Sequence, residues 1–215
     1  MTPMKFQLTT YAWLILIPVI LLAIYATSSR VGYRFQNRGE AVVSSYLMTS
    51  LPLDKWHLLN NITLKVDDHT TQIDHILVST FGVFVIETKH YSGWIFGDAN
   101  SKSWTQVMYR MKFRFQNPLR QNFKHLKAVQ QLLDFVATEH IKGVVVFSGN
   151  ATFKTSPPVG VHTIGSMVDY LKGLTEEVLT ENRMQFCVGR LECKRLALTQ
   201  TTDVEHRQTL AARKR

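Results

Sequence analysis

The sequence predicts a mixed α/β fold, a mixed β-sheet flanked by helices, with one apolar helix ahead of it. Residues 11–26, YAWLILIPVILLAIYA, contain no charged side chain. Residues 72–89 contain two strand-like runs joined by a short turn. Residues 143–147, GVVVF, form a fully apolar run that is typical of a buried central strand. The chain has 215 residues, enough for one domain and a short additional segment.

The first apolar run predicts a membrane anchor over residues 1–29. With its apolar neighbours the run covers residues 8–26, about the length that spans a bilayer as a helix. We expect the segment to be retained rather than cleaved as a signal peptide, because no A-x-A cleavage pattern follows it. Only Lys5 precedes the span, whereas three arginines follow it by residue 38. The positive-inside rule therefore predicts a single-pass protein of the cell (inner) membrane, with its N-terminus outside and its soluble domain in the cytoplasm.

The charge of the remaining chain favours anionic partners. The net charge is +9, and residues 30–215 carry 24 basic and 16 acidic side chains. Such an excess suits nucleic acid or anionic lipid headgroups. The two cysteines, Cys187 and Cys193, are too few for a disulfide framework or for a four-cysteine zinc site. They are typical of reduced cytosolic thiols, in agreement with the predicted orientation.

A helix is expected at the start of the soluble domain. Residues 30–36 form a short juxtamembrane linker, and Asn37 is a helix cap with Glu40 three residues later. Val43 and Leu47 follow on the same helical face, so Glu40 lies in line with the buried stripe. The alternative for Glu40 is a capping-box role, in which its carboxylate accepts a hydrogen bond from a backbone N–H.

Several strands follow this helix. We expect strands at residues 61–66, 72–79 and 83–89, the last two joined in a hairpin through Thr80 and Phe81. A second hairpin is predicted between Trp94 and Trp104, which we interpret as core residues, although tryptophans also stack on nucleic-acid bases. Residues 107–115 alternate between apolar and basic side chains and predict one continuous strand.

The second half of the soluble part predicts helices and short strands. Asn117 and Pro118 form a good helix start, and the helix is expected to run to about residue 139. Its predicted apolar stripe consists of Leu119, Phe123, Leu126, Leu133 and Val136. After the strand at residues 143–147, a C-terminal α/β extension over residues 151–200 is expected to pack on the domain. Its elements are a strand near 159–164 and helices near 166–173 and 175–197. Residues 201–215 form a basic polar tail.

The first hairpin brings two acids together. If Thr80 and Phe81 form a two-residue turn, Asp74 lies opposite Glu87, with Cβ atoms about 5 Å apart. Two carboxylates at this distance repel each other unless a cation lies between them, and oxygen ligands suit Mg²⁺ or Mn²⁺. Lys89 lies on the same face, where an ammonium can orient a water or stabilise charge on a phosphate. The alternative is a solvated hairpin face with an ordinary Glu-x-Lys pair. The acids interrupt apolar strands, which indicates partial burial.

Five blocks of sequence resemble the NERD (nuclease-related domain) family over roughly residues 37–150. The blocks include TQIDHILVSTFGVFVIETKHYSGWIFGD, RGE upstream of it, Trp104, and NPLRQNFKHL downstream. This family is placed in the PD-(D/E)xK nuclease-like superfamily, so the resemblance implies a restriction-endonuclease-like fold. It also implies roles for Glu40, Asp74, Glu87 and Lys89 as the helix acid, the first acid, the second acid and the lysine of that superfamily. Gln72 and Gln121 match further family positions beside the site.

The resulting expectation is a Mg²⁺- or Mn²⁺-dependent nuclease. Asp74 and Glu87 would hold the metal with help from the Thr88 carbonyl, Lys89 would position the attacking water, and Glu40 would orient a second water or ligand. Nucleic acid, with DNA favoured over RNA, would be bound by Arg110, Lys112, Arg114, Arg120, Gln121, Lys124 and Lys127. The alternative for these residues is a solvated basic surface. His69, His75 and His125 lack metal-ligand spacing and are expected to serve packing or the surface.

Two other functions stay open from the sequence alone. One is a catalytically silent nucleic-acid-binding or scaffold module held at the membrane. The other is an envelope protein whose basic tail meets anionic lipid. Metal-dependent cleavage distinguishes the nuclease from both, and salt-sensitive nucleic-acid binding distinguishes the silent module from the lipid-binding protein.

Overall fold

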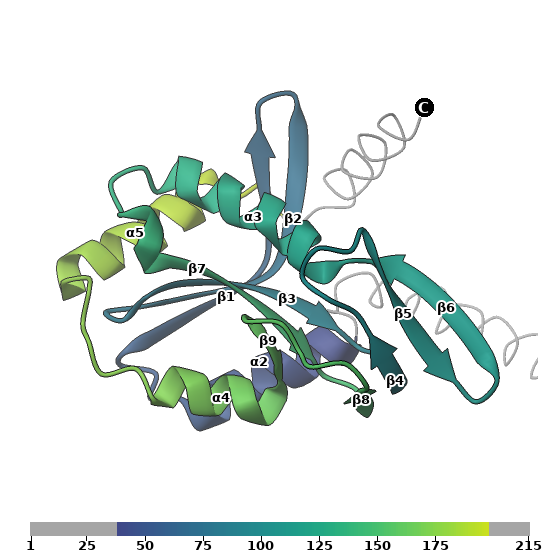
Figure 1. Ribbon diagram of the computed structural model, residues 1–215. Helices are drawn as coiled ribbons and strands as arrows, with labels where there is room; N and C mark the ends of the chain where they lie inside the picture. Colours follow the sequence, from purple (N-terminus) through teal and green to yellow (C-terminus); the bar gives the residue numbers. More distant parts are fainter. Residues whose placement is uncertain (1–37, 198–215) are drawn as a thin grey trace, which may run out of the picture. The chain divides into compact units, whose positions relative to one another are not determined.

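The computed structural model describes residues 38–197, which form a mixed α/β fold with two mixed sheets flanked by helices (Figure 1). The larger sheet has the strand order β1-β2-β3-β7-β9 and the smaller one β6-β5-β4-β8. The larger sheet consists of β1 (Trp56–Val66), β2 (His69–Ser79), β3 (Gly82–Lys89), β7 (Ile141–Phe147) and β9 (Val161–Thr163). The smaller sheet consists of β4 (Gly93–Phe96), β5 (Ser103–Met108), β6 (Met111–Gln116) and β8 (Ala151–Phe153). The helices are α2 (Arg38–Ser50), α3 (Pro118–Leu132), the short 3₁₀ helix η1 (Thr138–His140), α4 (Ile164–Lys172) and α5 (Glu181–Lys194).

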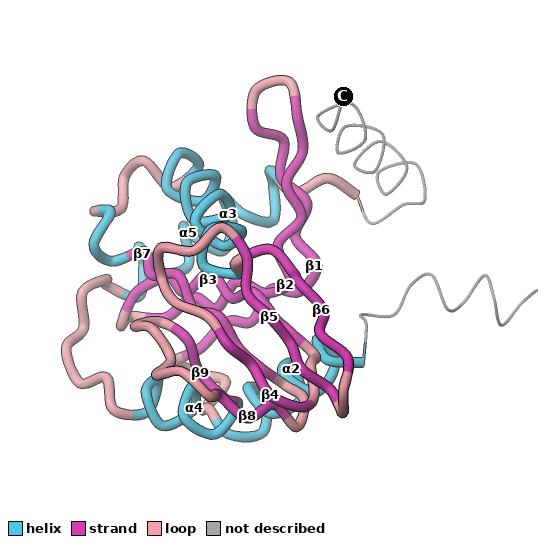
Figure 2. The backbone as a smooth tube through the Cα atoms, turned by 45° about the vertical axis from the view of Figure 1, so that its right-hand side comes forward, coloured by secondary structure: helices cyan, strands magenta, loops and turns pink. Residues whose placement is uncertain are grey.

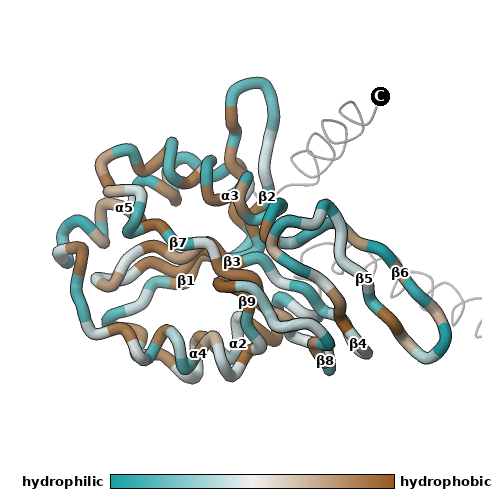
Figure 3. Tube along the Cα trace, in the orientation of Figure 1, coloured by the Kyte–Doolittle hydropathy of each residue, from teal (hydrophilic) through white to brown (hydrophobic). Residues whose placement is uncertain are grey.

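Helices cover both faces of the larger sheet. Figure 2 shows α3 and α5 on one side of it and α2 and α4 on the other. Because successive side chains of a strand point to opposite faces, β3 contributes to two cores. Val83 and Val85 pack in the cluster that contains Val129 of α3, whereas Phe84 packs in the cluster that contains Val43 of α2. The middle strands are therefore apolar along their length, whereas the exposed end of the β1–β2 hairpin is hydrophilic (Figure 3). The predicted buried strand at residues 143–147 is confirmed as part of β7, between β3 and β9.

The hairpin register predicted from the turn is confirmed. Ser79 pairs with Gly82 across a two-residue turn, and the antiparallel pairing of β2 with β3 continues to His75 and Ile86. Beyond Ile86, β3 stays paired with its parallel neighbour β7 as far as Lys89. Asp74 and Glu87, the next residues on the two strands, therefore lie where β2 and β3 cease to pair. This is also the end of the sheet at which α2 begins.

The single strand predicted for residues 107–115 is wrong. Met108 pairs with Met111, so the chain reverses at Tyr109 and Arg110, and β5 and β6 form a hairpin. Tyr109 takes a left-handed conformation, with φ of 56°, and its side chain is 94% exposed. No residue type signals this turn, because neither residue is a glycine, asparagine or aspartate. Trp104 is buried as expected, but the prediction that Trp94 is a core residue is wrong, because it is 51% exposed.

Other boundaries also differ from the prediction. Helix α3 begins at Pro118 with the Asn117 side chain as its cap, as predicted, but it ends at Leu132 rather than near residue 139. In the predicted apolar stripe, Leu133 and Val136 are buried and Leu119 and Leu126 are partly buried. The prediction is wrong for Phe123, since this ring is 56% exposed, and the helix also buries Asn122 and His125. Helix α5 begins at Glu181 rather than near residue 175, and strand β8 was not predicted.

Helix α2 confirms the expected placement of Glu40, which is buried with Val43 and Leu47. The predicted anchor over residues 8–26, the linker, the cap at Asn37 and the tail over residues 201–215 lie outside the described residues. Between residues 38 and 197, no helix is long and apolar enough to cross a bilayer.

Candidate functional site

Asp74 occupies the position where strands β2 and β3 separate. Its Oδ2 atom accepts a hydrogen bond from the backbone N–H of Thr88 at 2.7 Å. The Asp74 side chain thus accepts the hydrogen bond that a backbone carbonyl of β2 would accept if the pairing continued beyond His75 and Ile86. This contact fixes Asp74 beside Glu87, the neighbour of Thr88 on β3.

Glu87 is buried, with 2% of its surface exposed, and is held by a lysine. The Lys89 ammonium lies 2.6 Å from Glu87 Oε1. The same ammonium donates a hydrogen bond to Gln121 Oε1 at 3.0 Å. Lys89 is therefore fixed between its own strand and helix α3, with 16% of its side-chain surface exposed.

His125 of α3 completes the surroundings of Glu87, a role that the sequence did not reveal. Its Nε2 lies 3.2 Å from Glu87 Oε2, within reach of an ion pair, but the geometry is not that of a hydrogen bond. Its Nδ1 is 2.7 Å from Thr71 Oγ1 on β2. The available signal was helical spacing, because His125 follows Gln121 by four residues and thus shares its face.

The two carboxyl groups differ in protonation. Burial, together with the nearby charges of Glu87 and Glu40, raises the pKa of Asp74 to about 8, and the Thr88 N–H and Lys89 only partly oppose this. Burial also raises the pKa of Glu87, but His125 and Lys89 outweigh that effect and hold it below its usual value. At neutral pH, Glu87 is ionised and Asp74 retains its proton. An additional positive charge beside Asp74 would favour the loss of this proton.

Glu40 reaches the same site from the opposite side of the sheet. It lies in the first turn of α2 and is 9% exposed. Its charge acts on Asp74, as the raised pKa of that group shows. The helix acid, the two strand acids and Lys89 are thus gathered at one end of the larger sheet, although they come from positions up to 49 residues apart in the chain.

A groove runs along the site between β2 and α3, with a volume of about 930 Å³. We call it the Asp74 groove. Residues of both elements line it, including Gln72, Asp74, Gln121, Phe123, Lys124, His125 and Lys127. Two of the predicted cationic residues, Lys124 and Lys127, thus line the same groove as Asp74.

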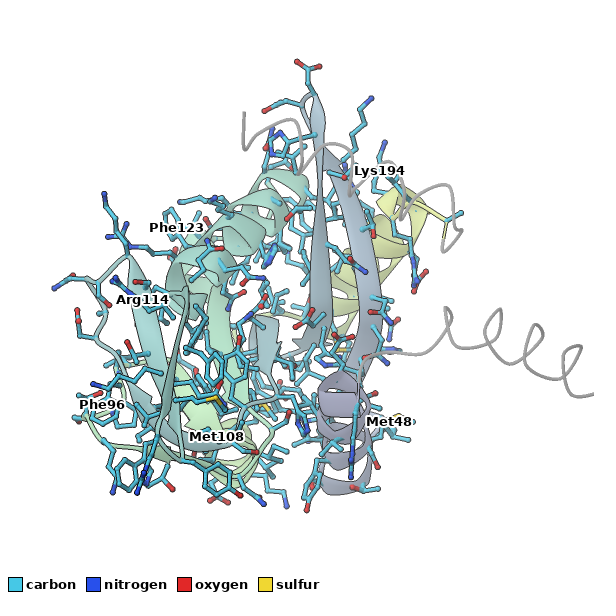
Figure 4. The ribbon with its side chains drawn as sticks, turned by 90° about the vertical axis from the view of Figure 1, so that its right-hand side faces the viewer. Met48, Phe96, Met108, Arg114, Phe123 and Lys194 are labelled. Carbon is cyan, nitrogen blue, oxygen red and sulfur yellow. The ribbon has the colours of Figure 1, made fainter. Side chains whose placement is uncertain are left out.

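A second groove of about 590 Å³ adjoins the first. Its lining includes Lys102 and Arg120, and it shares Phe123 and Lys124 with the Asp74 groove. The remaining predicted cations, Arg110, Lys112 and Arg114, are not among the residues that line these two grooves and belong to the β5–β6 hairpin. Figure 4 shows Phe123 on α3 and Arg114 on the neighbouring β6. The predicted binding residues therefore fall into two groups.

The donor set at Asp74 fits a small divalent cation. Asp74 lines the groove, and the buried Glu87 Oε2 lies 3.2 Å from His125 Nε2. Among residues 38–197, no three Asp, Glu, His or Cys side chains are placed to hold a metal by themselves. Mg²⁺ commonly uses one or two carboxylates and completes its coordination with waters and substrate phosphates. The pair of Asp74 and Glu87 is of this type.

Comparison with known proteins agrees with this geometry. The family model described as "Nuclease-related domain" matches residues 36–148, more than half of the chain. An uncharacterized protein of Bacillus anthracis is 43% identical over 97 residues, which cover 45% of this chain and 45% of that protein. The chain thus spans about half the length of the curated relative it matches. No solved structure matches the chain. With the family match covering the helix acid, both strand acids and the lysine, the chain belongs to the nuclease-related domain (NERD) family, within the PD-(D/E)xK-like nuclease superfamily.

Proposed function

We propose that this protein is a metal-dependent nuclease that hydrolyses phosphodiester bonds at Asp74 and Glu87. One observation carries the proposal. Two carboxyl groups and a lysine ammonium meet at the separated end of β2 and β3, and one of them, Asp74, opens onto a groove that Lys124 and Lys127 also line. A structural Glu-x-Lys pair needs neither the third acid, Glu40, nor the opening onto a groove. Nucleic acid as the partner class follows from the family and from the positive charge.

Asp74 and Glu87, with the Thr88 carbonyl, would hold Mg²⁺ or Mn²⁺. Such an ion, when bound, acidifies a coordinated water and polarises a phosphate oxygen. Lys89 orients the attacking water and stabilises negative charge on the phosphate, because Glu87 and Gln121 fix its ammonium. Glu40 orients a further water or ligand from the α2 side.

The cationic residues would bind the substrate backbone on either side of the site. Lys124 and Lys127 lie along the Asp74 groove, beside Gln72 and Gln121, and Arg120 lies in the adjoining groove. Arg110, Lys112 and Arg114 extend the positive surface over the β5–β6 hairpin. Phosphate contacts of this kind give affinity and register without reading sequence. DNA is the favoured substrate.

We further propose that the enzyme is held at the cell (inner) membrane. The support is the uncharged run within residues 8–26 and the arginines that follow it. The N-terminus would then lie outside, and the nuclease domain would act on cytoplasmic nucleic acid close to the bilayer.

Four variants test the catalytic proposal. Full-length protein is assayed on single-stranded, duplex and branched DNA and on RNA, with Mg²⁺, Mn²⁺ or EDTA. Asp74→Asn and Glu87→Gln should abolish cleavage and weaken metal binding, because each removes a ligand charge. Lys89→Ala should lose cleavage but keep metal binding, because its ammonium acts on water or phosphate. Asp134→Asn, which changes an exposed acid just beyond α3, is the matched control and should retain full activity.

The result also separates the nuclease from the alternative, a silent binding module. Cleavage that survives in Asp74→Asn would exclude this site. If the wild type binds nucleic acid with a steep salt dependence but shows no cleavage and no thermal shift with Mg²⁺ or Mn²⁺, the protein is the silent module.

A further inference from the structure

The smaller sheet has an inner and an outer face. Ile95 of β4 and Trp104 of β5 are fully buried and pack with Phe147 of the larger sheet. Because side chains alternate along a strand, the neighbours of Ile95 point away from this core. These neighbours are Trp94 and Phe96, which are 51% and 37% exposed. Two large rings on an internal strand therefore lie partly exposed on the outer face of the sheet.

Basic side chains share this outer face. Directly paired residues lie on the same side of a sheet, so the pairing of Trp94 with Val107, and of Val107 with Lys112, places Lys112 in the row of Trp94. In the same way, Phe96 pairs with Thr105 and Thr105 with Arg114. Figure 4 shows Phe96 and Arg114 along one outer side of this sheet. Each row thus carries one aromatic ring on β4 and one cation on β6.

Further contacts hold cations over the face. The Arg114 guanidinium donates a hydrogen bond to Ser103 Oγ at 3.0 Å, and Lys154 Nζ lies 4.6 Å from the centre of the Trp94 ring. The four strands of the sheet contain no Asp or Glu. The surface therefore combines two partly exposed aromatic rings, one of them beneath the Lys154 ammonium, with positive charge that no carboxylate on these strands neutralises.

We propose that this outer face binds single-stranded nucleic acid, with bases stacked on Trp94 and Phe96 and phosphates held by Lys112, Arg114 and Lys154. Aromatic rings on a sheet surface beside basic residues are the general means of holding unpaired bases. This inference rests on the proposed function and names its substrate class. It gives a role to Trp94, which takes no part in the proposed catalysis.

The spacing of the rings favours single strands over a duplex. Residues two apart on a strand are separated by about 7 Å, about twice the rise of 3.4 Å between stacked bases. Bases that occupy both rings must therefore be unstacked from each other, which a duplex does not permit. A protein partner or a lipid surface would not require this arrangement, and each is an outcome of the test below.

Binding is measured with full-length protein in EDTA, where metal-dependent cleavage is silent. Fluorescence anisotropy of a labelled oligo-dT and of a duplex compares wild type with Trp94→Ala, Phe96→Ala and Trp94→Phe. Trp94→Ala should weaken single-strand binding by about 5- to 150-fold, whereas Trp94→Phe, which keeps a stacking ring, should stay close to wild type. Duplex affinity should change little. Phe186→Ala, at an exposed ring on α5, is the control and should bind as wild type.

Several results would overturn the inference. The first is that Trp94→Ala and Phe96→Ala bind oligo-dT as tightly as the wild type does. The second is that the wild type does not bind oligo-dT, which would leave a protein as the partner of this face. Vesicles of phosphatidylcholine and phosphatidylglycerol are tested in parallel. If the two substitutions weaken binding to the vesicles and leave oligo-dT binding intact, the surface is a lipid contact instead.

A cleavage assay separates this inference from the proposed function. With Mn²⁺ and a single-stranded substrate, Trp94→Ala should raise KM and leave kcat near wild type, since its ring lies on a different sheet from Asp74. Lys89→Ala should instead lose kcat and keep oligo-dT affinity in EDTA. If Lys89→Ala cleaves normally, the catalytic proposal fails while the binding surface stands. If Trp94→Ala has a normal KM, the proposed binding surface fails while the catalytic proposal stands.

Discussion

At the scale of single residues, Asp74 gives the protein a specific dependence on pH. Its pKa is about 8 in the folded chain, against 3.8 for an ordinary aspartate. Between these values, the folded state keeps a proton that the unfolded state has lost, so the free energy of unfolding falls as pH rises from about 4 to about 8 and then levels off. Asp74→Asn should remove this decline and make the metal-free protein more stable at pH 8. Urea unfolding in EDTA between pH 5 and pH 9 measures the effect.

The same measurement has an internal check. Adding Mn²⁺ should restore stability to the wild type at pH 8 and leave Asp74→Asn nearly unchanged, because a ligand stabilises only the state that binds it. Asp134→Asn should follow the wild-type curve. An equal pH slope in wild type and Asp74→Asn would show that the carboxyl is ionised in the folded protein.

Single residues also show what the sequence can and cannot predict at the site. Counting back from a two-residue turn places Asp74 beside Glu87, and strand alternation adds Lys89. His125 escapes prediction because the most apolar stripe of α3 is expected to be its buried face. The helix instead turns the polar Asn122 and His125 inward, and a pattern of hydrophobicity cannot reveal polar groups that are satisfied by distant strands.

At the scale of elements, one amide of α3 bonds to two strands of the larger sheet. Asn122 Nδ2 donates hydrogen bonds to the carbonyls of Val85 on β3 and Val144 on β7, at 2.9 and 3.0 Å. Asn122→Ala should lower the free energy of unfolding by about 1–3 kcal/mol, because it removes buried hydrogen bonds. It should also reduce cleavage, since Gln121 and His125 lie on the same helix. Chemical unfolding and a cleavage assay measure the two effects.

The matched control for this helix is Gln131→Ala, whose side chain is exposed on α3. It should shift stability by less than about 0.5 kcal/mol. A similar loss of stability in both variants would mean that the loss does not come from the buried hydrogen bonds of the Asn122 amide.

The elements also differ in how readily the sequence predicts them. The β2–β3 hairpin follows from its glycine-containing turn and its apolar alternation. The β5–β6 hairpin does not, because alternation continues across the reversal and Tyr109 takes a left-handed conformation without the usual turn residues. The end of α3 cannot be predicted from the sequence for a related reason. Leu133 and Val136 remain buried after the helix has ended, so the apolar period continues although the helical backbone does not.

At the scale of the whole molecule, the net charge of +9 predicts that binding to nucleic acid depends on salt. Each phosphate contact releases condensed counterions, so log affinity should fall linearly with log salt. Replacing both Lys124 and Lys127 with alanine should flatten the slope by about 0.7–0.9 for each phosphate that is no longer neutralised. Lys172→Ala, on α4 at the other face of the larger sheet, should leave the slope unchanged. Anisotropy titrations at several salt concentrations measure this slope. If the slope is the same with and without the two lysines, Lys124 and Lys127 do not contact phosphate.

The proposed anchoring makes a second prediction for the whole chain. Because one lysine precedes residues 8–26 and several arginines follow, a reporter fused after Arg215 should be active in the cytoplasm. Paired fusions to alkaline phosphatase and to green fluorescent protein provide the readout. Phosphatase activity without fluorescence would reverse the orientation, and full recovery of the protein in the soluble fraction would exclude the anchor.

The hydrogen bond from the Thr88 N–H to Asp74 has a consequence for how the site can be observed. The amide nitrogen lies 2.7 Å from the carboxyl oxygen, so its proton is sensitive to the charge on that group. Its resonance in a nitrogen–proton spectrum should therefore move as Asp74 loses its proton, and again when a cation arrives. Because the strands part at this point, this amide is protected from solvent exchange by a side chain rather than by the sheet. One backbone signal thus makes the titration and the loading of the site visible separately, with no substrate or turnover.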